Sequence, residues 1–168
     1  MNKATILLAA LLWPAAAQAQ RPATSAYTPL DIDRCSLIEE IEEGAGASWR
    51  CPGRSGIALF ATTGDGRMDV DAGIDNGQWE SLMPFNRPGP QVEWRLRGGR
   101  PFAIIYRLLW EDGVGGRGST LIVETIGRRA AAGCEVARID GATPDANATA
   151  RARADAIQPN FRCPRPSE

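Results

Sequence analysis

Histidine is absent from this chain of 168 residues, and lysine occurs once, at Lys3. The two absences exclude Ser-His and Cys-His nucleophile pairs, Schiff-base chemistry, zinc held by histidine, and the phosphate-binding loop that depends on a lysine. Long apolar runs are also missing beyond the N-terminal segment, because Arg107 separates the apolar residues 102–106 from 108–110. A membrane-spanning helix needs about 20 apolar residues, so we expect no membrane insertion of the mature chain.

An excess of positive charge is missing as well. Without Lys3, 18 arginines stand against 20 acidic residues, which gives a net charge of −2. Proteins that bind nucleic acids in general concentrate positive charge on one surface. We therefore expect no nucleic-acid partner.

The first 19 residues have the three parts of a secretory signal peptide. Lys3 supplies a positive start, residues 4–13 an apolar core, and Ala17-Gln18-Ala19 a small-residue cleavage signature. The core of ten residues is too short to span a bilayer. The sequence predicts a signal peptide over 1–19, cleavage before Gln20, and a periplasmic or secreted mature protein.

The four cysteines are expected to form disulfides, because an exported chain folds in an oxidising compartment. Cys35, Cys51, Cys134 and Cys163 allow three pairings. We favour Cys35–Cys51 and Cys134–Cys163, since each bond then closes a local loop. The first loop, of about 15 residues, is worth on the order of 3 kcal/mol. No pair has the C-x-x-C spacing of zinc or thioredoxin-like sites.

A flexible polar leader is predicted at 20–28, followed by one globular domain at 29–168. Hydrophobic alternation and turn residues divide the domain into short strands. In residues 67–71, Met68 and Val70 share one face, and Asp69 and Asp71 share the other, which we expect to be solvated. Strands are predicted at 48–51, 56–62, 67–71, 92–96, 101–110, 119–126 and 134–139, with a strand or short helix at 35–41 and a turn at Pro52-Gly53.

The segment 92–110 is predicted to be a hairpin, because strict alternation precedes Gly98-Gly99 and an apolar run follows it. A two-residue loop would place Arg95 opposite Phe102. An odd-numbered loop or a bulge buries apolar side chains against one another, and we prefer it. The preferred pairs are Leu96 with Phe102, Trp94 with Ile104, and Val92 with Tyr106.

One helix is predicted late in the chain. Thr143 is suited to its N-cap, Pro144 to its first position, and Pro159 ends it. Its narrow apolar stripe consists of Ala146, Ala150, Ala154 and Ile157. The predicted fold class is α+β: an antiparallel sheet of five to six strands, one C-terminal helix packed against it, and two disulfides.

Two surfaces are candidate binding sites. The segment 76–91 contains three prolines and little periodicity, and its Trp79 and Phe85 are of the type that anchors protein interfaces. Arg95, Arg97 and Arg100 surround the hairpin tip, and arginine forks suit carboxylate or phosphate groups. Each surface also has a purely structural interpretation. Trp79 and Phe85 would then anchor the loop 76–91 to the core, and the arginines would form a solvated edge with local ion pairs.

Catalytic and metal sites receive little support. Asp69 with Asp71, or Glu93 with Glu111, are conceivable acid and base pairs for glycoside cleavage. Asp69 and Asp71 also begin a calcium-loop pattern that continues through Asp75 and Glu80. Its fifth and sixth positions are glycine and isoleucine instead of a ligand and glycine. We predict no metal and no cofactor.

Several short motifs occur in a recognisable order along the mature chain. They are Tyr27-Thr28, Leu30-Asp31, the stretches 49–56, 93–95, 102–105 and 134–137, Phe85-Asn86, and 144–147 ahead of Cys163. In these motifs the chain resembles a group of small exported, uncharacterised proteins common in alphaproteobacteria. That group typically has histidine after the third cysteine, where this chain has Glu135. The resemblance implies an exported domain with two disulfides and names no chemistry.

Taken together, these patterns favour a non-enzymatic binding or inhibitor-like periplasmic protein. Its partner would be an envelope protein or polysaccharide. Two other classes remain open: a small carboxylate-dependent hydrolase of envelope polysaccharide, and a structural envelope component. A cleft with two carboxyl groups about 5–9.5 Å apart would favour the hydrolase.

Overall fold

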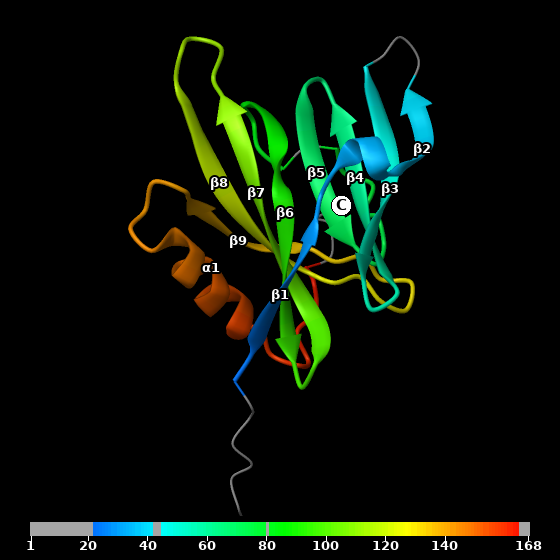
Figure 1. Ribbon diagram of the computed structural model, residues 1–168, viewed down its shortest axis with the longest axis vertical. Coiled ribbons are helices and arrows are strands. Elements are labelled where there is room, and N and C mark those ends of the chain that lie inside the picture. Colours follow the sequence, from blue (N-terminus) through cyan, green and yellow to red (C-terminus); the bar gives the residue numbers. More distant parts are fainter. Residues whose placement is uncertain (1–21, 42–44, 80, 165–168) are drawn as a thin grey trace, which may run out of the picture.

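The computed structural model of the chain describes residues 22–41, 45–79 and 81–164 (Figure 1). The signal peptide predicted at 1–19 lies outside this part of the chain. Within it, nine strands form two antiparallel sheets, with one α-helix. The α+β fold class is confirmed, although the strands are more numerous than predicted and occupy two sheets. No helix of the described residues is long and apolar enough to cross a bilayer.

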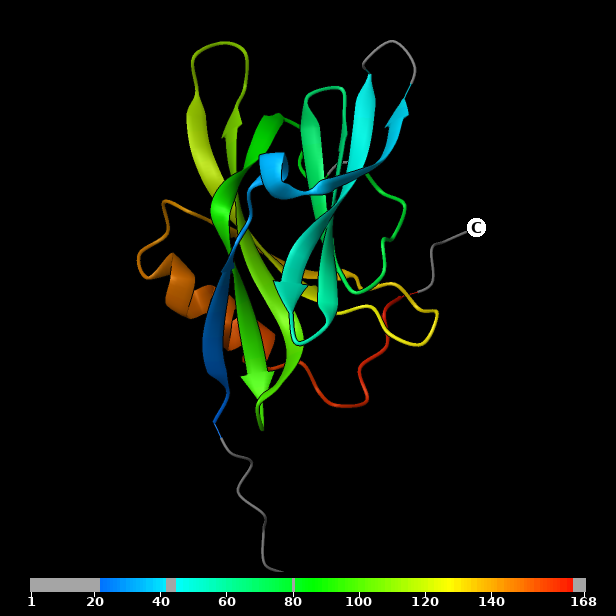
Figure 2. The ribbon, with the colours of Figure 1, turned by 45° about the vertical axis from the view of Figure 1, so that its right-hand side comes forward.

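The larger sheet has five strands in the order β1-β6-β7-β8-β9. They are β1 Thr24–Pro29, β6 Phe85–Arg97, β7 Arg100–Glu111, β8 Arg117–Thr125 and β9 Glu135–Asp140. The smaller sheet has four strands in the order β2-β3-β4-β5. They are β2 Ser36–Ile41, β3 Gly46–Arg54, β4 Ile57–Gly64 and β5 Arg67–Ala72. A short 3₁₀ turn, η1 Ile32–Arg34, lies where the chain crosses from β1 to β2 (Figure 2).

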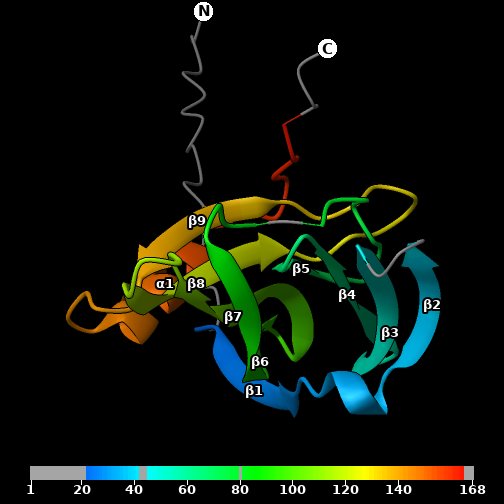
Figure 3. The same cartoon turned by 90° about the horizontal axis from the view of Figure 1, so that it is seen from above.

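Side-chain alternation divides the core into two parts. The even-numbered residues Ile104 and Tyr106 of β7 pack with Trp94 of β6 and with Leu59 of the smaller sheet. The odd-numbered residues of β7 and β8 face the helix α1, Ala146–Asp155. Seen from above, α1 covers the outer side of the larger sheet, away from the smaller one (Figure 3). Both faces of β7 are therefore buried, and the apolar run in its sequence suits this position.

The helix presents the predicted stripe to the sheet. Ala146, Ala150 and Ala154 are buried and Ile157 packs against their cluster. The predicted start was wrong by two residues, since the cap is Asp145 in a left-handed conformation without a side-chain cap bond. Thr143 instead accepts the Ala146 N–H through its backbone carbonyl at 3.1 Å, which closes a turn before the helix.

The β6–β7 hairpin combines the two alternatives for its register. Arg97 pairs with Arg100 across a two-residue turn, and a bulge follows between Arg95 and Leu96. The bulge restores the apolar pairs Trp94–Ile104 and Val92–Tyr106, which confirms two of the preferred pairs. The third was wrong, because Leu96 lies opposite Pro101.

Two local predictions differ from the structure. Residues 24–28 of the predicted leader lie in β1, an edge strand that pairs with β6. The turn predicted at Pro52-Gly53 is an irregularity within β3, and the chain reverses at Ser55-Gly56 instead. Gly53 is required there because a Cβ would lie 2.0 Å from the Ile57 carbonyl oxygen.

Both favoured disulfides are present. Cys35–Cys51 joins the start of β2 to β3, and Cys134–Cys163 joins the start of β9 to the C-terminal segment. Every cysteine is thus paired with its neighbour along the sequence, and the chain holds no free thiol. Such disulfides are typical of proteins outside the reducing cytoplasm.

Candidate functional site

A hollow of about 800 Å³ lies at the end of the larger sheet that carries the β6–β7 turn. Three segments form its walls: the hairpin around residues 97–102, the loop after β8 at 125–132, and the C-terminal segment 157–163. Five arginines line it and no aspartate or glutamate does. The arginines are Arg97, Arg100, Arg128, Arg129 and Arg162, and the aromatic residues Phe102 and Phe161 accompany them.

Arg97 and Arg128 hold the walls in place. The Arg97 guanidinium lies 4.2 Å from the centre of the Phe102 ring, and it donates to the backbone carbonyls of Asp155 and Ile157 at 3.1 and 3.2 Å. Arg128 donates to the backbone carbonyl of Pro101. These contacts connect the hairpin to the helix end and to the loop, so the hollow has a fixed frame.

Arg100 and Arg129 are exposed and supply charge that the described chain does not neutralise. Neither side chain makes an ion pair or a hydrogen bond with another described residue. Each guanidinium therefore keeps five N–H donors for a solute. Arginines of this kind bind carboxylate or phosphate groups through paired hydrogen bonds.

The turn that carries Arg129 has an unfavourable backbone. Arg128 and Ala131 exchange backbone hydrogen bonds of 2.8 and 3.0 Å around Arg129 and Ala130, whose φ angles are 54° and 65°. This two-residue turn normally uses Asn-Gly, and left-handed backbone costs other residues about 1–2 kcal/mol each. Strained residues concentrate at functional sites, which makes this rim a stronger candidate than an ordinary surface turn.

The third wall depends on a disulfide. Cys163 lines the hollow and is bonded to Cys134 at the start of β9. Residues 157–163 contain no regular element after α1, so this bond and the contacts of Arg97 fix their path. The second disulfide thus shapes the site as well as stabilising the chain.

Comparison of the chain with family models, curated proteins and solved structures finds no match. The geometry of the site therefore carries the functional argument.

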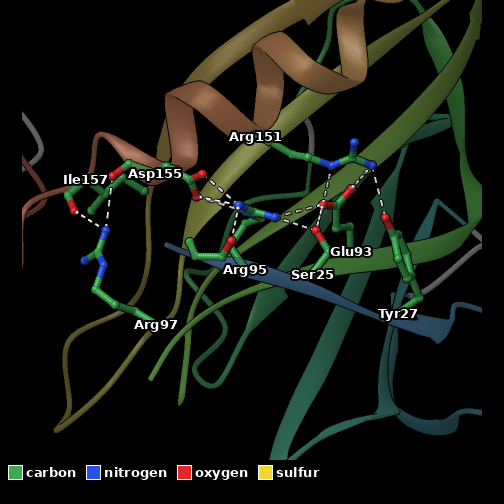
Figure 4. Close-up of polar contacts among 9 residues, drawn as sticks. Ser25, Tyr27, Glu93, Arg95, Arg97, Arg151, Asp155 and Ile157 are labelled. Atoms are coloured by element: carbon green, nitrogen blue, oxygen red, sulfur yellow. Dashed lines mark hydrogen bonds and ion pairs between the residues drawn. The ribbon is translucent and has the colours of Figure 1, made fainter. Parts of the chain in front are cut away.

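Arg95, the third arginine predicted near the hairpin tip, is not part of the hollow. It is 4% exposed and lies between β1, β6 and α1 (Figure 4). Its guanidinium donates to Asp155 through two nitrogens, at distances down to 2.7 Å, and it also donates to Ser25. Arg151 of α1 pairs with Glu93 at 2.7 Å, and this contact raises the pKa of Arg151. The network attaches the helix to the sheet.

Trp79 and Phe85 are not near the arginines of the hollow. Phe85 begins β6 and Arg97 ends it, so the two predicted surfaces occupy opposite ends of one strand. Trp79 and Phe85 pack against the β4–β5 turn: a Cβ on Gly64 would lie 2.6 Å from the Trp79 ring, and one on Gly66 would lie 3.0 Å from Phe85. Trp79 and Phe85 remain 38% and 48% exposed.

Sequence reasoning missed a cluster of buried acids between the sheets. Asp69 and Asp71 of β5 are 5% and 2% exposed, so the prediction of a solvated face was wrong. The loop after β5 and the larger sheet cover them. Asp69 accepts hydrogen bonds from Ser81, from the Tyr106 hydroxyl at 3.1 Å and from the Asn76 amide at 3.2 Å. No alternation pattern could reveal this, because the covering groups come from distant segments.

The second acid, Asp71, has a different environment from Asp69. Its Oδ2 accepts the Asn76 backbone N–H at 3.0 Å, whereas its Oδ1 meets no donor N–H among the described residues. Glu124 of β8 is also 2% exposed, and its Oε1 likewise meets no donor among the described residues. Burial, followed by the charges of Asp69 and Asp75, raises the pKa of Asp71 to about 7. Burial and the neighbouring Asp71 carboxyl raise the pKa of Glu124 well above its usual value.

The acids do not form a metal centre among the residues that the structure describes. No group of three or more Asp, Glu, Cys or His side chains there is arranged to hold an ion. Glu80, the last position of the calcium-loop pattern, lies outside those residues.

Proposed function

We propose that the chain is an exported binding protein that holds an anionic, ring-bearing ligand in the arginine-lined hollow. The observation that carries this proposal is the lining itself: five arginines, two phenylalanines and no carboxylate around about 800 Å³ in a chain with more acidic than basic residues. Such a concentration of one charge needs a counter-charge, and the described chain supplies none to Arg100 or Arg129.

The chemistry of the lining favours a ligand with several carboxylate or phosphate groups on a flat, partly apolar body. Arginine recognises planar anions through paired donors, and it stacks on aromatic rings. Arg97 over Phe102 already forms such a stack at the wall. Uronic-acid-rich polysaccharide and acidic peptides of the envelope both carry these groups.

Export is supported by the N-terminal signal pattern and by the two disulfides, which favour a periplasmic or secreted location. The resemblance to exported alphaproteobacterial proteins points the same way. A binding domain held together by two disulfide bonds is suited to a location outside the cytoplasm.

The carboxylate-dependent hydrolase is the weaker candidate. Asp69 and Asp71 are buried between the sheets, not exposed in a cleft. Glu93 lines a smaller groove of about 210 Å³, but no other acid does, and Glu111 lies at the opposite end of β7 from the hairpin turn. Neither pair offers two carboxyl groups to one substrate.

The test is calorimetric titration of the oxidised protein, residues 20–168, with benzene-1,3,5-tricarboxylate. Benzyl alcohol supplies the ring without charge, and inorganic phosphate supplies charge without the ring. We expect binding of the tricarboxylate, weaker binding of phosphate and none of the alcohol. Replacing Arg100 and Arg129 by Ala should weaken tricarboxylate binding by about 10-fold or more, since each charge-assisted contact is worth about 1.5–3 kcal/mol.

Arg117→Ala is the matched control, because Arg117 is an exposed arginine at the start of β8, away from the hollow. It should bind as the unmodified protein does. The proposal fails if the tricarboxylate does not bind, or if Arg117→Ala weakens binding as much as the changes in the hollow.

A further inference from the structure

We infer that the Asp71 and Glu124 carboxyl groups share a proton, and that this shared proton joins the two sheets. As pH rises, the pair releases its other proton, and the negative charge that results weakens anion binding in the hollow. The first half is argued from the burial of the two carboxyl groups and from the donors that they lack. The second half concerns regulation of the hollow and rests on the proposed function.

The carboxyl pair spans the two sheets. Asp71 belongs to β5, at the edge of the smaller sheet, and Glu124 belongs to β8 of the larger one. Asp71 Oδ1 and Glu124 Oε1 are buried and meet no N–H or hydroxyl donor of the described residues. Two carboxyl groups can hydrogen-bond to each other only if one keeps its proton. The contact therefore requires a protonated acid.

The surroundings of the pair oppose a second negative charge. Asp69 on β5, Asp75 in the following loop and Glu135 on β9 all add negative charge, and Tyr106 of β7 is a further titratable neighbour. Arg138 of β9 adds positive charge, but its ion pair is with Glu135 at 2.6 Å. No arginine makes an ion pair with Asp69, Asp71 or Glu124 in the described chain. Asp69 accepts hydrogen bonds from three donors, whereas Asp71 Oδ1 and Glu124 Oε1 meet none, so a proton is favoured on Asp71 and Glu124.

The pair lies directly behind the hollow. Thr125 and Ile126, which follow Glu124, line the hollow, and the Gly127 N–H donates to the Ala72 carbonyl, next to Asp71, at 2.8 Å. The two backbones touch closely there, since a Cβ on Gly73 would lie 2.4 Å from the Gly127 carbonyl oxygen. A charge gained by Asp71 repels an anion in the hollow, so an anionic ligand favours the protonated pair.

The direction of the pH dependence follows from the raised pKa. Asp71 has its pKa near 7 in the fold against 3.8 in its ordinary state. Between these values the folded chain holds more protons than the unfolded chain, so stability is greatest at low pH and is lost as pH rises toward 7. The values belong to the coupled pair as a unit. After the first proton leaves, the second is shared between the Glu124 and Asp71 carboxyl groups.

The first experiment needs no ligand. Infrared spectra of the oxidised protein at pH 8 should show the carbonyl band of a protonated carboxyl, and Glu124→Gln, whose amide can donate in place of the acid, should remove it while keeping the fold. Urea unfolding from pH 4.5 to 7.5 should show the unfolding constant rising by at least on the order of 100-fold, and Asp71→Asn should make that rise smaller by on the order of 100-fold, while the part that comes from Glu124 remains. Glu40→Gln, an exposed carboxyl on β2, is the control.

The retained proton is refuted if the unmodified protein shows no such band at pH 8. It is also refuted if Asp71→Asn keeps the pH dependence of the control.

The second experiment titrates benzene-1,3,5-tricarboxylate at pH 6 and pH 8, where the charge of this ligand is constant. We expect an affinity several-fold lower at pH 8 in the unmodified protein and equal affinities in Asp71→Asn. Equal affinities in both proteins overturn the coupling alone. Absence of binding at both pH values instead overturns the proposed function, and the infrared and unfolding results still decide whether the pair retains a proton.

Discussion

Arg95 shows how much one side chain contributes to the attachment of the helix. Its side chain is 5% exposed, and its guanidinium contacts Asp155 of α1, Ser25 of β1 and, at 3.5 Å, Glu93 of its own strand. The Glu93 carboxylate joins the same three elements, since it accepts hydrogen bonds from Ser25 of β1 and from Arg151 of α1. Removal of a buried charge with this many partners lowers the stability strongly, because it leaves the partners without a counter-charge.

We expect Arg95→Ala to lower the free energy of unfolding by about 3–5 kcal/mol. The loss of stability in Arg95→Lys should be smaller than in Arg95→Ala, because lysine restores the charge without the planar guanidinium fork. Urea unfolding monitored by circular dichroism measures both. Arg117→Ala, a change at an exposed arginine, should stay within about 0.5 kcal/mol of the unmodified protein. Similar losses in Arg95→Ala and Arg117→Ala would contradict this account.

At this scale, sequence reasoning succeeded where the cause was local. The alanine stripe of the helix follows from its period, and the disulfide pairing follows from loop length. The method failed for Asp69 and Asp71, whose alternation with Met68 and Val70 reads as a half-exposed strand. Their burial depends on Tyr106 and on Glu124, which are distant in sequence. It failed for Arg129 as well, because nothing in Arg-Arg-Ala-Ala signals a turn.

At the scale of elements, the loop between β8 and β9 is the least expected feature. Its turn places Arg129 and Ala130 in left-handed conformations that glycine would adopt freely. The sequence offers glycines at 127 and 133 but not at the turn itself. The loop therefore keeps a side chain at the rim of the hollow at the expense of backbone strain.

We expect Ala130→Gly to raise the free energy of unfolding by about 0.5–1 kcal/mol, because relief of strain exceeds the extra freedom of the unfolded chain. The same change at Ala148, an exposed position inside α1, should lower it by about 1 kcal/mol. Thermal unfolding of the two variants measures this difference in sign. A loss of stability in both would show that the turn is not strained.

The strands illustrate which parts of an element a sequence can specify. The β6–β7 register followed from apolar matching at Trp94 and Val92, since burial penalises any slip by one residue. The bulge beside Leu96 was anticipated only as an alternative, and its position was not. β1 was missed because a short edge strand with polar residues differs little in pattern from a leader.

At the scale of the whole molecule, neither disulfide links one sheet to the other. The first disulfide, Cys35–Cys51, joins the start of β2 to β3 within the smaller sheet. The second, Cys134–Cys163, joins the start of β9 in the larger sheet to the C-terminal segment. The sheets meet through the apolar core around Trp94 and Leu59, and the Gly127 N–H donates to the Ala72 carbonyl at 2.8 Å beside the buried acids. The sequence could suggest strands and bonds, but the division into two sheets depends on contacts between distant segments.

Reduction of both disulfides should lower the stability by roughly 7 kcal/mol, because loops with separations of 16 and 29 residues are each worth about 3–4 kcal/mol. A domain of this size is typically stable by about 5–15 kcal/mol. We expect the melting temperature to fall by on the order of 20 °C. Differential scanning calorimetry with and without reductant measures it. A fall of only a few degrees would mean that the core alone maintains the fold.

The pairing of each cysteine with its next neighbour also has a kinetic consequence. A chain delivered N-terminus first presents Cys35 and Cys51 together long before Cys134 arrives. The Cys35–Cys51 disulfide can then form before Cys134 and Cys163 arrive. Each cysteine therefore meets its native partner first, and no non-native disulfide has to form. Oxidative maturation of this chain should therefore need an oxidant but no reshuffling enzyme.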